Sequence, residues 1–98
     1  MSSQLRAILD FVNDEKSFLR FLQALAGNWE HGQQKELANP SQPYGPGANG
    51  WENNTIGAYL DAAFQWGDSS SDGIECYEKP SNPWKRAAEI LYMGKLYE

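Results

Sequence analysis

The chain has 98 residues, enough for one small domain with a modest hydrophobic core, and we expect a single helical domain over residues 1–98. Hydrophobic residues make up 41% and aromatic residues 13% of it, a composition typical of globular rather than disordered proteins. The formal net charge of −5 argues against nucleic acid as a partner, because phosphates repel an acidic surface.

The cysteine count, the apolar runs and the first residues of the sequence favour a cytoplasmic location. Cys76 is the only cysteine, so the chain cannot form an internal disulfide. No apolar run approaches the roughly 18 residues that cross a membrane. Residues 1–16 lack the basic start, long apolar stretch and small-residue cleavage site of a secretory signal. We therefore expect a cytoplasmic protein that has no contact with a membrane.

Two helices are predicted in the first third of the chain. An amphipathic helix over residues 3–12 is indicated by the helical spacing of Leu5, Ile8, Leu9 and Val12. Asn13 is the expected N-cap of a second helix, which runs to about Trp29. The predicted apolar face of this second helix consists of Phe18, Phe21, Leu22, Leu25 and Trp29, and Leu19 and Ala26 widen it.

A long loop is predicted over residues 31–50, where three prolines and four glycines lie among polar side chains. It is either a tolerated insertion or a recognition loop. The third helix is then predicted to begin at Asn53 or Asn54 and to end near Gly67. Its predicted core face consists of Ile56, Tyr59, Leu60, Ala63 and Phe64.

A second loop, residues 67–82, leads into the fourth predicted helix. Ser81 or Asn82 is the expected N-cap, followed by Pro83 at the first helical position, where proline is favoured. Gly94 lowers the helix propensity and predicts that a neighbouring helix comes close at this point. The expected fold class is therefore all-α: a small bundle of about four helices with two long loops.

The residue types that carry chemistry form no convincing site. His31 is the only histidine, and Cys76 has no evident basic partner, so we expect neither a nucleophile nor a metal centre. Residues 68–73 resemble the first half of a calcium loop, but the glutamate required at position 12 is replaced by Lys79. The glycine-rich residues 45–50 lack the ending of a phosphate-binding loop. We therefore expect no cofactor.

The four tryptophans are the remaining candidates for a site, and each is predicted at or near a helix end. They either close the ends of the core or wall a concave pocket. Packing explains Glu52 least of these residues. Near a helix start its carboxylate either gains from the helix dipole or pairs with Lys85, Arg86 or Lys95. The candidate binding surface consists of Trp51, Glu52, Asn53, Trp66 and Trp84.

Three segments resemble a family of small bacterial proteins of unknown function: NDEKSFLRFLQAL, WENNTIGAYLDAAFQW and PWKRAAEILYMGKLYE. The resemblance covers roughly residues 13–98, and its most specific parts are Trp51-Glu52-Asn53 and the terminal Tyr97-Glu98. The loop at 31–50 is longer than usual for the family, and the loop at 67–82 is divergent. The resemblance implies a bacterial origin and fold boundaries, but no reaction.

Two functional hypotheses follow. The first is a non-enzymatic protein-binding or accessory module, by analogy with small families that serve as immunity proteins. It would act through contact with another protein or with a second copy of itself. The alternative is a small-ligand-binding or hydrolase-like domain with a pocket near Trp51, Glu52 and Trp66.

Overall fold

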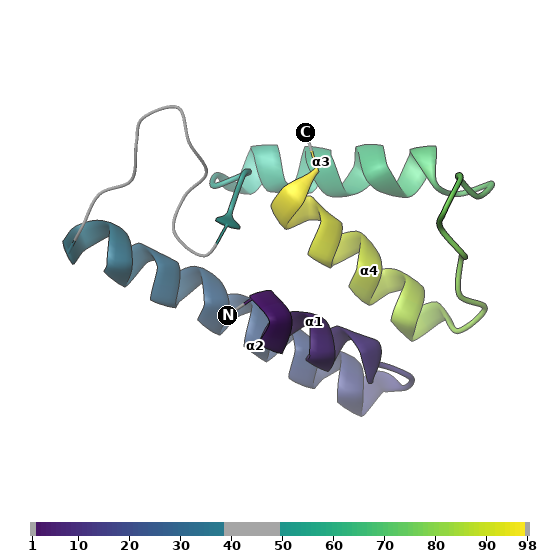
Figure 1. The fold of residues 1–98 in the computed structure, drawn as a ribbon, viewed down its shortest axis with the longest axis horizontal. Coiled ribbons are helices and arrows are strands. Elements are labelled where there is room, and N and C mark those ends of the chain that lie inside the picture. The colour runs from purple at the N-terminus through teal and green to yellow at the C-terminus, as the bar shows by residue number, and fades with distance from the viewer. Residues whose placement is uncertain (1, 39–49, 98) are drawn as a thin grey trace.

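The computed structural model of the protein describes residues 2–38 and 50–97. These residues form four helices: α1 (Ser2–Asp10), α2 (Glu15–Ala38), α3 (Ile56–Ser69) and α4 (Pro83–Leu96) (Figure 1). They contain no strand, and a single isolated bridge joins Ile74 to Tyr77. The predicted all-α class is confirmed.

The central helix of the fold is α4, which contacts each of the other three. Figure 1 shows α4 between α3 on one side and the α1–α2 pair on the other. By contrast, α3 packs mainly on α4. One side of α3 is therefore turned away from the rest of the described chain.

The main core lies where α1, α2 and α4 meet. Its buried side chains are Leu5, Leu9, Val12, Phe21, Leu25, Trp51, Ala88 and Tyr92. Most of the apolar residues predicted for the first two helices therefore face the core. Trp29 is an exception, since it was predicted on the apolar face of the second helix but is 38% exposed. Phe21 and Ala88 at the centre are completely buried.

Both ends of α2 differ from the prediction. The cap is Asp14 rather than Asn13, because the Asp14 carboxylate accepts hydrogen bonds from the Ser17 amide (2.8 Å) and hydroxyl (2.7 Å). These bonds with Ser17 lower the pKa of Asp14. The helix runs to Ala38 instead of Trp29, since residues 33–38 are good helix formers and the first proline comes only at position 40. The remainder of the predicted loop, residues 39–49, lies outside the described residues.

The start of α3 was also predicted wrongly. Thr55 is the N-cap, and its hydroxyl oxygen accepts the Ala58 amide at 3.1 Å. The helix ends at Ser69, beyond the predicted stop at Gly67. For α4, the predicted cap Asn82 is confirmed, since its side chain accepts the amides of Trp84 and Lys85.

The face that α3 buries agrees only in part with the predicted one, since Tyr59 and Ala63 of the predicted face are covered. The buried or half-buried residues are Tyr59, Ala62, Ala63 and Trp66, whereas Ile56, Leu60 and Phe64 are exposed. The cause is the close approach of α4 at Gly94, which confirms the prediction for that glycine. A Cβ atom at Gly94 would lie 2.9 Å from the Tyr59 ring, 3.0 Å from Ala63 Cβ and 3.1 Å from the Tyr59 carbonyl oxygen.

Candidate functional site

The Trp51-Glu52-Asn53 segment covers the C-terminal end of α4. The backbone amides of Glu52 and Asn53 donate to the Lys95 carbonyl at 3.0 and 3.4 Å. The Asn53 side chain donates to the carbonyls of Gly94 (3.1 Å) and Tyr97 (2.6 Å). The last carbonyls of a helix have no partner within it, so these donors complete α4. Asn53 therefore caps the end of α4, not the beginning of α3 as predicted.

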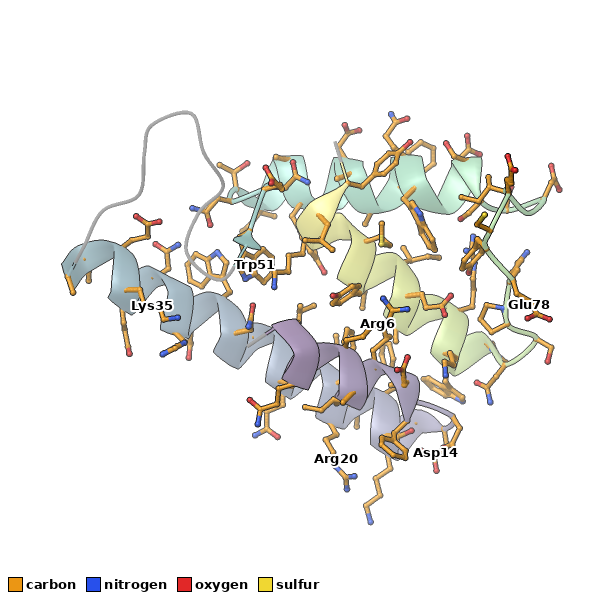
Figure 2. The ribbon with its side chains drawn as sticks, in the orientation of Figure 1. Arg6, Asp14, Arg20, Lys35, Trp51 and Glu78 are labelled. Atoms are coloured by element: carbon orange, nitrogen blue, oxygen red, sulfur yellow. The ribbon has the colours of Figure 1, made fainter. Side chains whose placement is uncertain are left out.

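Trp51 anchors this segment. Its side chain is 7% exposed, and its indole Nε1 donates to the Asn28 side chain at 2.8 Å. The ring centre lies 5.8 Å from that of Tyr59, and the Lys95 ammonium lies 5.6 Å from the Trp51 ring centre. Figure 2 shows Trp51 between α2 and the end of α4. Burial lowers the pKa of Lys95, and the attraction of the ring for a cation partly offsets that desolvation.

Glu52 is exposed, and its predicted ion pair is not formed. The three cations proposed for it have other neighbours: Lys85 donates to the Asp10 carbonyl, Arg86 to the Gly67 carbonyl, and Lys95 lies on Trp51. Within residues 2–38 and 50–97 the Glu52 carboxylate makes no ion pair. Its negative charge therefore faces solvent beside the start of α3.

The opposite end of the α3–α4 pair is held by Arg86, which was predicted only as a possible partner of Glu52. Its guanidinium donates to the Gly67 carbonyl (2.8 Å) and to the Ser70 hydroxyl (2.9 Å), and so completes the C-terminus of α3. The same group lies 5.2 Å from the ring centre of Trp66 and donates to the Tyr77 hydroxyl at 3.1 Å. Arg86 is therefore the counterpart, at this end, of the Trp51–Asn53 segment.

Tyr77 completes the cluster around Arg86. Its hydroxyl donates to the Glu89 carboxylate at 2.6 Å, and its ring packs edge-on against Trp66. Burial, together with the hydrogen bond to Glu89, raises the pKa of Tyr77. Tyr77 lies beside Arg86 because residues 70–82, which connect α3 to α4, fold back against both helices. No local sequence pattern therefore indicated the cluster.

The turn that resembled a calcium loop is the end of α3. Ser70 is its C-cap and is buried, with its hydroxyl donating to the Trp66 carbonyl at 2.7 Å. Lys79, at the position of the required glutamate, donates to the Ser71 carbonyl at 2.9 Å. Across the described ranges, no three histidine, cysteine, aspartate or glutamate side chains are grouped as a metal site requires.

The five residues of the predicted binding surface do not share one surface. Asn53 precedes α3 and Trp51 packs against Tyr59 in its first turn, whereas Trp66 lies seven residues beyond Tyr59, about 10 Å farther along the helix axis. Trp84, at the start of α4, is 37% exposed and packs against Phe18 of α2. The pocket predicted between Trp51, Glu52 and Trp66 therefore has no common centre.

A shallow groove lies instead between α1, α4 and the turn after α3. Its volume is about 270 Å³, and its lining includes Arg6, Trp66, Cys76, Glu89 and Tyr92. Cys76 is exposed and has a backbone φ of 65°. His31 lines a different groove, between α1 and α2, so the structure does not bring the thiol and the imidazole together.

The outer side of α3 carries a row of exposed apolar side chains, which we name the outer row: Ile56, Leu60 and Phe64. Their exposed fractions are 80%, 56% and 64%. The spacing of four residues places them one above another on the helix surface. Asp61 and Asp68 are exposed on the same helix. In Figure 1 this helix forms one edge of the molecule.

No helix in the two described ranges combines the length and the apolar character needed to cross a bilayer. Among known proteins, no curated protein and no solved structure matches the chain. The model of one protein family, described as a family of unknown function (DUF7660), matches residues 14–98. This range is close to the one over which the sequence resembled a family of unknown function. The chain belongs to this family.

Proposed function

We propose that this protein is a non-enzymatic protein-binding module that contacts its partner through the outer row of α3. The observation that carries the proposal is the exposure of Ile56, Leu60 and Phe64, each more than half accessible. Contiguous exposed apolar side chains on a small protein commonly mark an interaction site. Burying them against a partner helix would remove them from water.

The outer row differs from the other exposed apolar residues of the fold. Phe11, Leu19 and Leu37 are also exposed, but they lie apart on the α1–α2 pair. Single exposed hydrophobic residues are normal and require no explanation. On α3, by contrast, the apolar surface is wider than α4 covers, and the uncovered part is one continuous row. This excess favours a contact that forms only with a partner.

The contacts around Trp51 favour this proposal over a ligand pocket near Trp51, Glu52 and Trp66. The Trp51 ring is buried and its polar edge is bonded to Asn28, so it offers little to a small molecule. Trp66 is buried at the other end of α3. We place the module in the bacterial cytoplasm, in an accessory role of which immunity is one form. The exposed free thiol of Cys76 accords with a reducing compartment.

Affinity capture with paired variants tests the proposal. The test variant is Ile56→Ser with Phe64→Ser. The control is Phe11→Ser with Leu37→Ser, which removes equally exposed apolar groups from α2 and the α1–α2 turn. All four side chains are more than half exposed, so both variants should fold. We expect the native protein and the control to retain the same partner from the source cytosol, and the α3 variant to lose it. Equal retention by the two variants would overturn the proposal.

A further inference from the structure

We infer that the partner presents a basic amphipathic helix, with apolar residues on the outer row and lysine or arginine beside it. This inference rests on the proposed function and adds the chemistry of the partner.

The negative charge of the chain is concentrated in the segment that contains α3. Residues 36–78 hold no lysine or arginine, whereas their acidic residues are Glu36, Glu52, Asp61, Asp68, Asp72, Glu75 and Glu78. This segment alone is more negative than the whole chain, whose net charge is −5. The remaining residues therefore carry a small net positive charge, and the acidity belongs to one region.

Within α3, the acidic side chains border the outer row. At about 100° per residue, Asp61 and Asp68 lie on the side of Leu60 opposite to the buried Tyr59 and Trp66. Both are exposed, and in the described part of the chain neither makes an ion pair. The outer row is thus limited by α4 on one side and by two unpaired carboxylates on the other.

The cations nearest in sequence are engaged away from this border. Lys79 donates to the Ser71 carbonyl beyond the end of α3, and Arg86 donates to Gly67 and Ser70. Lys95 is buried against Trp51. The field at the outer row is therefore set by carboxylates, and a partner with positive charge beside its apolar residues is complementary to it.

The same charges disfavour the other occupants of an apolar row. A second copy docked α3 to α3 would bring Asp61 and Asp68 of both molecules together, and like charges across a contact are unfavourable. An anionic bilayer would be repelled in the same way. A basic helix satisfies both the apolar row and its acidic border. Exposed ion pairs add little affinity, so the charge mainly selects the partner and speeds its arrival.

The test uses two synthetic peptides of about 18 residues, or five helical turns. One has leucine along one face and lysine beside it, and the other has glutamate at every lysine position. Each is added to the isotope-labelled full chain and followed by NMR. We expect the lysine peptide to shift the signals of residues 56–68. We expect the glutamate peptide to bind at least about tenfold more weakly, as like charge replaces opposite charge on both flanks.

Paired variants separate specific from general attraction. Asp61→Asn with Asp68→Asn should weaken the lysine peptide about fivefold at low salt and reduce the salt dependence of binding. The control, Glu15→Gln with Glu30→Gln, removes the same charge from exposed positions on α2 and should leave the affinity nearly unchanged. Equal losses in the two variants would overturn the inference, because binding would then depend on net charge alone.

Four further outcomes decide against the inference. Equal affinity of the two peptides for α3 would refute the inference that the partner is basic, but it would not contradict the proposed protein contact. Sedimentation that shows a dimer lost on Leu60→Ser, or binding to phosphatidylglycerol vesicles through α3, would replace the helix by another occupant. If neither peptide shifts residues 56–68 and the paired capture variants behave alike, the proposed function fails as well.

Discussion

At one end of the α3–α4 pair the carbonyls of a helix terminus are met by neutral amides, and at the other end by a guanidinium. The Glu52 and Asn53 amides and the Asn53 side chain complete α4, whereas Arg86 completes α3. Each end also places a cation against a tryptophan ring, Lys95 on Trp51 and Arg86 on Trp66. The last carbonyls of a helix need hydrogen-bond donors from outside it, and the two ends supply them with different groups, amides at one and a guanidinium at the other.

The difference shows why two segments that look equally important have unequal roles. The Trp51 end joins α3 and α4 to α2 through Asn28, so it connects the pair to the main core. The Arg86 end connects α3 and α4 with the turn between them. Loss of the first should loosen the whole fold, and loss of the second should loosen only the pair.

Replacement of Trp51 by alanine should have the largest effect. Removing a buried indole and its cavity-filling contacts costs about 3–5 kcal/mol of unfolding free energy. Trp84→Ala, at a tryptophan that is 37% exposed, is the matched control and should cost clearly less. Urea unfolding followed by circular dichroism measures both. Similar losses for the two variants would show that Trp51 does not join the pair to the core.

The next effect is expected at the other end. Arg86→Ala removes the donors to Gly67 and Ser70 and should cost about 1.5–3 kcal/mol, the range for hydrogen bonds that involve a charged group. Asn53→Ala removes neutral donors and should cost about 1–2 kcal/mol. Hydrogen exchange should show the loss from Arg86→Ala confined to α3, α4 and the turn. Uniform loosening of α1 and α2 would contradict this division.

The close contact between α3 and α4 can be tested at Gly94. A methyl group there would meet the Tyr59 ring, its carbonyl oxygen and Ala63 at about 3 Å. Gly94→Ala should therefore cost about 1–2 kcal/mol, although alanine favours helix. Gly27→Ala in α2 has no atom within 4 Å and should stabilise by about 0.5–1 kcal/mol. Thermal melts of the two variants should move in opposite directions, and a rise for Gly94→Ala would refute the close approach.

The smallest effect concerns alkaline pH. The Tyr59 hydroxyl donates to the Leu91 carbonyl at 2.8 Å, and burial raises the pKa of Tyr59 from 10.0 to about 12. Between these values the unfolded chain loses a proton that the folded chain keeps, so stability falls as pH rises. Lys95, whose pKa is lowered, has the opposite sign, and its contribution rises towards pH 10.5. Urea midpoints between pH 9 and 11 should fall less steeply in Tyr59→Phe, and parallel profiles would argue against a buried Tyr59 proton.

The sequence predicted the elements better than the contacts between them. Helical periodicity and caps indicated all four helices, and the Asn82 cap and the Gly94 contact were predicted correctly. The buried face of α3 was predicted correctly only at Tyr59 and Ala63, because the apolar residues of this helix cover more than one face and periodicity alone cannot decide which face packs. The contact at Gly94, which lies far along the chain, decides it.

The candidate site shows the same limit. Trp51 and Asn53 were identified as notable, but their partners are Asn28 and the end of α4, which no local pattern indicates. For the same reason Arg86 was predicted only as a possible partner of Glu52, and its contacts with Gly67 and Ser70 were not predicted. The residues of the outer row were predicted to be buried, as part of the core face of the third helix. Its exposure became visible once the position of α4 was known.

Crosslinking from Leu60 tests most directly whether the uncovered side of α3 is a contact surface. A photoreactive amino acid is introduced at Leu60, or at Phe11 as the control, and the protein is irradiated in the source cytosol. We predict one discrete adduct from Leu60, whose yield falls when Asp61→Asn and Asp68→Asn are introduced together, and no such adduct from Phe11. The same products from both positions, or none from Leu60, would contradict the account.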